Sequence, residues 1–181
     1  MDLLKEISFT LTKTKAGKIS AIAVKENYSI SELIDLTFHK DDAIAFRAAW
    51  ILEYIEVYFP ARFLPHFESF NKIYSNQKNH SCQRHFTKIM MHFTSKKAPE
   101  IYQNALRDID LESIVETTFS WLIDSKTPVA VKVNCLDILF DLSDKFDWIK
   151  DELKAQTEFL LRDGSAAMQS RGRKILGRLE N

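Results

Sequence analysis

Apolar residues recur every three or four positions along most of the chain, the spacing that gathers side chains on one face of an α-helix. Alternating runs of β-branched residues, typical of strands, are missing from the pattern. The sequence therefore predicts an all-α protein of about ten helices with short connections. The predicted stripes are Leu3, Leu4, Ile7 and Leu11; Ile19, Ile22 and Ala23; Ile30, Leu33, Ile34 and Phe38; Ile44, Ala48, Ile51, Leu52 and Ile55; Phe63, Phe67, Phe70 and Tyr74; Cys82, Phe86, Ile89 and Phe93; Leu111, Ile114, Val115, Phe119 and Leu122; Val129, Val133, Leu136 and Phe140; Trp148, Ile149, Leu153, Phe159 and Leu160; and Met168, Ile175, Leu176 and Leu179.

Residues with helix-terminating and helix-capping preferences lie between these stripes. Gly17 is predicted to follow the end of the first helix, and Ser29 or Ser31 to cap the third. Thr127 followed by Pro128 predicts an N-cap and a first helical residue. Such short, capped joints favour antiparallel pairs of neighbouring helices.

The second helices of the pairs align on one cationic position. Its four copies are separated by 37, 48 and 39 residues. An apolar residue stands three positions before, four after and eight after the cation in three of the four copies. The anchors are Arg47, Arg84, Lys132 and Arg171.

Three segments around these anchors resemble the second helix of a HEAT repeat. Residues 42–49, DAIAFRAA, have the acid, small apolar run, Arg and Ala of that motif; residues 127–132, TPVAVK, have Lys for Arg; residues 165–171 match more loosely. The likeness extends over about residues 30–179. It implies a right-handed α-solenoid of about five antiparallel helix pairs, with the second helices on the concave face, in a single domain of residues 1–181. A compact irregular helical bundle is the alternative.

Acidic and basic residues are unevenly distributed along the chain. The 25 basic and 25 acidic residues balance over the 181 residues, but residues 69–97 hold six bases and no acid, and residues 101–163 hold thirteen acids and seven bases. The two cysteines are too few for a disulfide framework, and no apolar run is long enough to span a membrane. The start of the chain also lacks the features of a signal peptide. We therefore expect a cytoplasmic protein without membrane attachment.

The segment NHSCQRHFTKIMMHF, residues 79–93, is rich in potential metal ligands. On a helix, Cys82 joins the apolar stripe, and His85 and His92 lie about 10 Å apart along the axis, too far to share one ion. The sequence thus predicts a repeat helix with a buried cysteine and no metal site. One side of this helix, carrying His85, Lys88 and His92, is expected to face an anionic partner.

The aligned cations suggest a row along one side of the solenoid that binds an anion. The HEAT resemblance implies a structural alternative, in which each cation contacts an acid or a carbonyl of an adjacent helix. The candidate binding residues are Arg47, Arg84, His85, Lys88, His92, Lys132 and Arg171.

The sequence contains no recognisable catalytic, cofactor or phosphate-loop motif. It favours a non-catalytic scaffold that binds another protein or an acidic peptide through its concave face, without a cofactor. The alternative is a nucleic-acid-binding protein related to the HEAT-like alkylation-repair DNA glycosylases. That resemblance implies a Trp and an acid at the site, for which Trp121 with Asp124 or Trp50 with Glu53 are the candidates.

Overall fold

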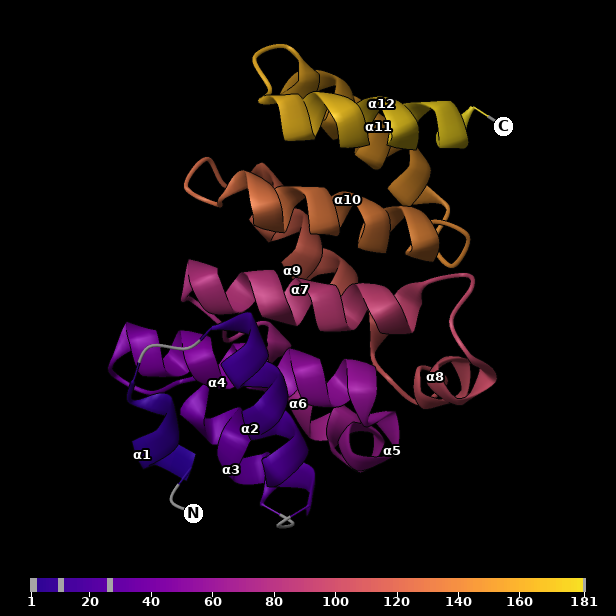
Figure 1. Ribbon diagram of the computed structural model, residues 1–181. Helices are drawn as coiled ribbons and strands as arrows, with labels where there is room; N and C mark the ends of the chain where they lie inside the picture. Colours follow the sequence, from indigo (N-terminus) through magenta and orange to yellow (C-terminus); the bar gives the residue numbers. More distant parts are fainter. Residues whose placement is uncertain (1–2, 10–11, 26–27, 181) are drawn as a thin grey trace. The chain divides into compact units, whose positions relative to one another are not determined.

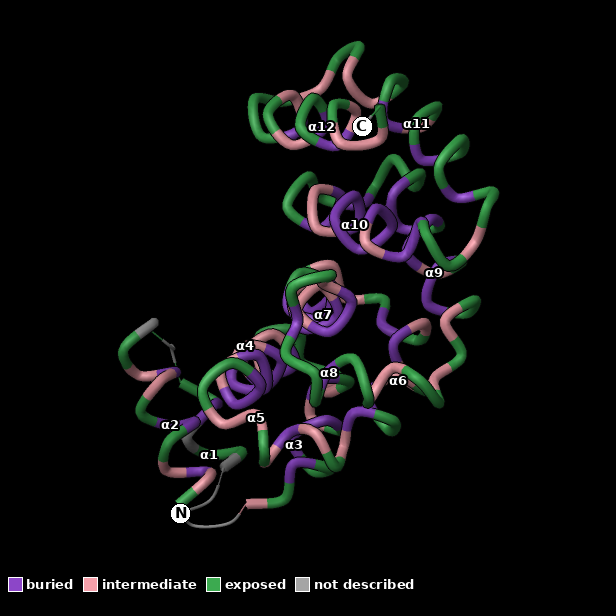
Figure 2. The backbone as a smooth tube through the Cα atoms, turned by 90° about the vertical axis from the view of Figure 1, so that its right-hand side faces the viewer, coloured by how far each residue is buried: buried purple, intermediate pink, exposed green. Residues whose placement is uncertain are grey.

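The computed structural model describes residues 3–9, 12–25 and 28–180, and every regular element in this part of the chain is a helix. The predicted all-α fold is confirmed. The chain divides into two compact units, Met1–Ile89 and Met90–Asn181, with the border inside the helix His80–Thr94. Each unit is described by itself (Figures 1 and 2).

The first unit is built around one long helix. Its elements are α1 (Leu3–Ile7), α2 (Lys13–Lys25), α3 (Ile30–Leu36), α4 (Asp42–Tyr58), α5 (Pro60–Phe63), the 3₁₀ turn η1 (Leu64–His66), α6 (Phe67–Tyr74) and the first residues of α7 (His80–Thr94). Helix α4 contacts α1, α2 and α3, and it contributes many buried residues, which are purple in Figure 2. This central position explains why α4 is apolar on more than one face.

Side-chain caps and prolines determine where these helices start and stop. The Ser29 hydroxyl accepts a hydrogen bond from the Glu32 amide, and the Asp41 carboxylate accepts from the amides of Ala43 and Ile44. Pro60 follows the end of α4 because it cannot continue the hydrogen-bonding pattern.

Aromatic rings fill the core of the first unit beneath α4. Phe63, Phe67, Phe70 and Tyr74 are all buried, as the stripe predicted. The Phe70 and Phe86 rings lie 4.7 Å apart between centroids, which joins α6 to α7.

The second unit contains two well-packed helix pairs. Its elements after α7 are α8 (Glu100–Ala105), α9 (Leu111–Ile123), α10 (Val129–Leu142), α11 (Trp148–Leu161) and α12 (Ala166–Leu179). Helix α10 packs on α9, α11 and α12, and α11 packs on α12 (Figure 1). Leu136, Ile138 and Leu139 of α10 are fully buried in this core.

Several predicted boundaries were wrong. Gly17 does not follow a helix end but lies inside α2, while α1 ends at Ile7; Leu11 lies outside the described residues. Thr127 does not cap α10, because the helix starts at Val129 and Pro128, with an extended backbone, takes the N-cap position. The short α8 was missed because its six residues carry no full apolar stripe.

Two further sequence-based expectations about the whole chain, the right-handed superhelix and the single domain, stay predictions.

Candidate functional site in the first unit

A row of aromatic side chains runs along α4. Phe46, Trp50, Tyr54 and Tyr58 are spaced four residues apart, so successive rings lie one turn above each other. Their centroids are separated by 5.7 Å, 6.4 Å and 5.4 Å in order along the helix. None of the four is fully buried, and Tyr58 is 62% exposed. The row is therefore available for contacts outside the unit.

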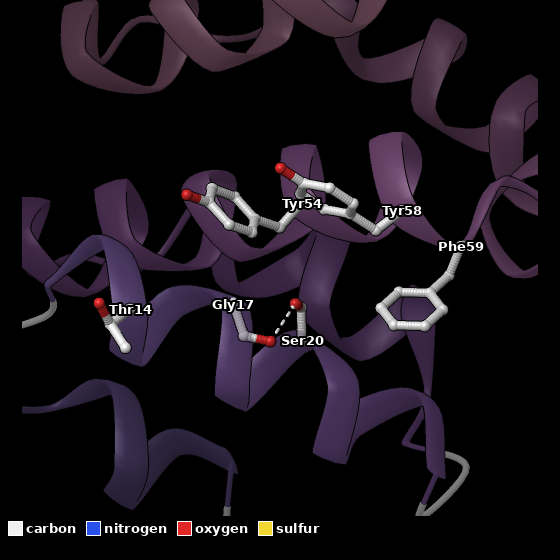
Figure 3. A pocket seen from close by; sticks show the side chains of 6 residues that line it. All are labelled: Thr14, Gly17, Ser20, Tyr54, Tyr58 and Phe59. Carbon is white, nitrogen blue, oxygen red and sulfur yellow. Dashed lines mark hydrogen bonds between the residues drawn. The ribbon is translucent and has the colours of Figure 1, made fainter.

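On its α2 side the row borders a cavity of about 460 Å³. Figure 3 shows Tyr54 and Tyr58 above α2, from which Thr14, Gly17 and Ser20 line the opposite wall. A Cβ at Gly17 would lie 3.4 Å from the Tyr54 ring, an ordinary van der Waals distance, so α2 packs beside the aromatic row at this position.

On its α7 side the row borders a second cavity, of about 380 Å³. Trp50, Tyr54 and Tyr58 form an aromatic wall, and Glu53, Arg84 and Lys88 bring charge to it. The same aromatic row thus separates two hollows, one with small polar side chains and one with cations.

Glu53 organises the charge of this second cavity. Its carboxylate is mostly buried; Oε2 contacts Nδ1 of His85, and Oε1 accepts a 2.9 Å hydrogen bond from Nζ of Lys88. Burial raises the pKa of Glu53, but the hydrogen bonds and charges of His85 and Lys88 outweigh burial and leave the pKa below its ordinary value. The His85 ring, 6% exposed, also stacks on Trp50 with centroids 6.2 Å apart. The ion pair therefore holds one ring of the aromatic row in place.

The predicted binding residues of the first unit have three different environments. Arg47 donates a 3.0 Å hydrogen bond to the carbonyl of Ile7, which is the structural contact implied by the HEAT resemblance. Arg84 and Lys88 line the α7-side cavity. His85 is buried against Glu53 rather than exposed toward a partner. Arg84 and Lys88 are thus the predicted cations that reach a surface hollow in this unit.

The remaining predicted residues belong to the second unit. Arg171 donates a 2.7 Å hydrogen bond to the carboxylate of Asp137, again a contact within the fold. Lys132 is buried at the start of α10 and lines a separate cavity. His92 lies near the end of α7 and is partly exposed.

A second cation on α12, Arg178, also contacts α10. Arg178 reaches Asp141 of α10 at 3.4 Å, and its guanidinium lies 3.8 Å from the Phe140 ring centroid. Sequence reasoning had not singled out this residue.

The acids that these side chains contact were not predicted as their partners: Glu53 was a candidate only beside Trp50, and Asp137 was not a candidate. Glu53 on α4 contacts His85 on α7, and Asp137 on α10 contacts Arg171 on α12. His85, one position after the aligned Arg84, therefore makes the contact in α7 that Arg171 makes in α12. An acid inside a largely apolar second helix is the sequence signal by which these partners could have been found.

The alternative pairs of Trp and acid differ in how they are placed. Trp50 and Glu53 line the same cavity, but the Glu53 carboxylate is already bonded to two side chains. Trp121 is buried in α9, and Asp124 caps the following turn by accepting from the Lys126 amide. Among the described residues, no cluster of three or more His, Cys, Asp or Glu side chains suits a metal ion.

Antiparallel helix pairs with buried second helices define the class of helical repeat proteins. More specifically, the chain belongs to the HEAT repeat domain family, which matches residues 3–179. This confirms the resemblance and extends it toward the N-terminus. Comparison with curated proteins found no match, and neither did comparison with solved structures. No helix in the described part of the chain is both long and apolar enough to cross a membrane.

Proposed function

We propose that this protein is a non-catalytic HEAT scaffold that binds another protein through the face formed by its second helices, with the aromatic row of α4 as the main contact. The observation that carries the proposal is the row itself. Four aromatic rings remain partly exposed along a helix that has a continuous buried side, with Ala48, Leu52 and Ile55 at 0% exposure. Exposed aromatic groups bordered by hollows are typical of protein interfaces, where Trp and Tyr contribute most of the binding energy.

The charges beside the row indicate the chemistry of the partner. The lining of this cavity brings two bases, Arg84 and Lys88, against one acid, Glu53, with which Lys88 pairs. We therefore propose a partner segment with an apolar or aromatic anchor and neighbouring acidic residues. The anchor would occupy the space beside Trp50 and Tyr54, and the acids would meet the two cations.

The same proposal places the scaffold in the cytoplasm, as a single domain that needs no cofactor. Both cysteines are buried free thiols, which fits a reducing compartment.

A photo-crosslinking amino acid at position 58 tests the contact surface. Position 123 is a matched control, because Ile123 is 57% exposed but lies in the second unit. We expect a discrete crosslinked protein from position 58 and none of the same mass from position 123. Binding of that protein, once purified, should weaken by roughly tenfold or more in the Tyr54→Ala variant. Equal crosslinking from both positions, or unchanged affinity of Tyr54→Ala, would contradict the proposal.

A second function, nucleic-acid binding, is favoured by one observation: Trp50 and Tyr54 lie in the same cavity wall as Arg84 and Lys88. Rings beside cations are how proteins stack unpaired bases and neutralise phosphates. This function predicts crosslinks that nuclease removes, affinity that falls steeply with salt, and loss of binding on reversing the charges of Arg84 and Lys88. Nuclease-resistant crosslinks with weak salt dependence would rule it out.

A further inference from the structure

A third hollow lies in the second unit, where two helices begin. This cavity of about 290 Å³ is bordered by the joint before α10, the first turn of α10, the end of α11 and the joint that leads into α12. It shares no residue with the cavities beside the aromatic row. It therefore needs an explanation of its own.

Lys132 is the most unusual group in its wall. The residue is only 8% exposed, and it forms no ion pair or hydrogen bond with any residue that the structure describes. Most of the side chain is buried, but its Nζ is not among the fully buried polar atoms, so the ammonium group reaches the hollow. A lysine that lines a hollow without a partner points to an anion from outside the chain.

Thr127 is a second polar group without a partner in the same wall. It is 4% exposed, and its buried hydroxyl makes no hydrogen bond within the described residues. A hydroxyl at this position can donate to an anionic oxygen. A buried polar group that is left unsatisfied in this way costs stability until a ligand satisfies it.

The two helix starts add positive potential. Helix α10 has Pro128 at its N-cap and therefore no side-chain cap, which leaves the first amides of a 14-residue helix without that acceptor. Helix α12 begins at the opposite side of the cavity lining, where Ser165 accepts from the Met168 amide. Helix N-termini attract anions through their amides and their dipole.

The other residues that line the cavity indicate the charge and polarity of the ligand. Arg162 brings a second cation, and Asp163 brings one carboxylate, so the lining favours an anion without being strongly positive. Phe159, Leu160 and Met168 form an apolar side. We propose that this cavity binds a phosphoryl group, as a free phosphate ion or as a phosphate monoester, with Lys132 and Thr127 as its buried ligands.

The test is a titration of the full-length ¹⁵N-labelled protein, followed by amide chemical shifts at constant ionic strength. Inorganic phosphate and phenyl phosphate are the two probes. We expect saturable shifts in the amides of residues 129–132 and 165–168. Tighter binding of phenyl phosphate identifies a monoester as the ligand, since its ring meets the apolar side; tighter binding of inorganic phosphate identifies the free ion.

Variants separate a specific site from general charge attraction. Lys132→Met should weaken binding by roughly tenfold or more, because it removes a charge-assisted hydrogen bond in a partly dry site. Lys154→Met removes an exposed lysine of α11 and the same net charge, and should leave affinity unchanged. Asp163→Asn should tighten binding by roughly threefold, since it removes a nearby like charge.

Shifts that do not saturate, or equal weakening by Lys132→Met and Lys154→Met, would overturn the proposal. If Lys132→Met does not fold, as judged by circular dichroism, the Asp163→Asn variant decides: tighter binding supports the site, and unchanged or weaker binding overturns it. Crosslinking from position 58 does not depend on this site, so failure of either proposal leaves the other intact.

Discussion

Replacing Glu53 by Gln tests whether the ion pair of α4 and α7 stabilises the first unit. Glutamine keeps the size of the side chain but removes its charge, so the buried His85 loses a charged acceptor. Hydrogen bonds to charged groups contribute about 1.5–3 kcal/mol. Lys88 is about one-third exposed and can regain water, so its share of the loss is small. We therefore expect the free energy of unfolding at pH 7 to fall by about 2 kcal/mol.

The pH dependence of this loss has a definite sign. The pKa of Glu53 is lower in the folded protein than its ordinary value of 4.5. Its contribution is thus fully present above that value and disappears as the pH falls through the folded pKa. The contribution of Glu53 to the stability gap between the natural protein and Glu53→Gln should therefore shrink as the pH falls below about 4.5 toward pH 3.

Urea unfolding followed by circular dichroism at several pH values measures the loss of unfolding free energy at pH 7 and its change with pH. Glu68→Gln is the control, because Glu68 pairs with Lys72 on the surface of the same unit and its loss should not change stability resolvably. A Glu53→Gln protein as stable as the natural one at pH 7 would refute the reasoning. So would a stability gap that stays the same down to pH 3.

Two other predictions concern packing and burial in each unit. Gly172→Ala should be less stable than Gly177→Ala by about 1–3 kcal/mol, because a Cβ at 172 would lie 2.9 Å from Leu161 whereas one at 177 meets nothing within 4 Å. Gly177→Ala should itself raise the melting temperature, since alanine favours the helix by up to about 1 kcal/mol; equal stability of the two variants would contradict the close packing of α11 on α12. Cys82 and Cys135 should not react with a thiol reagent at pH 8 in the native protein but should do so in urea, because burial raises both thiol pKa values, that of Cys82 to about 12. Rapid reaction of either cysteine with the reagent in the folded protein would contradict this prediction.

The parts of the fold that follow from one-dimensional patterns were predictable. The stripe of α7, for example, correctly placed Cys82 and Phe86 in the core. The wrong cap at Thr127 has a different cause: its hydroxyl is buried without a hydrogen bond, so local preference was overridden by packing around the joint. Periodicity also does not indicate that the segment of residues 60–74, which contains Pro65, is divided into α5, η1 and α6.

The candidate site was less predictable because it depends on pairing between helices far apart in sequence. Aligned cations suggested one repeated role, yet Arg47 bonds a carbonyl and Lys132 bonds nothing within the described residues. His85, chosen for a partner, instead supports Trp50 through a buried contact with Glu53. Which of two neighbouring positions faces an acid depends on a rotation of tens of degrees about the helix axis, and the apolar pattern tolerates such a rotation.

The two ion pairs between second helices have the same polarity along the chain. In each, the acid lies on the earlier helix and the base on the later one: Glu53 before His85, and Asp137 before Arg171. In a repeat protein each repeat contacts only its neighbours, so stability depends on matched contacts between successive repeats. In both units, a second helix that carries a buried acid is followed by a second helix whose basic side chain bonds that acid. A duplication that joined α4 directly to a second copy of itself would leave the mostly buried Glu53 carboxylate without the side chains of α7 that bond it.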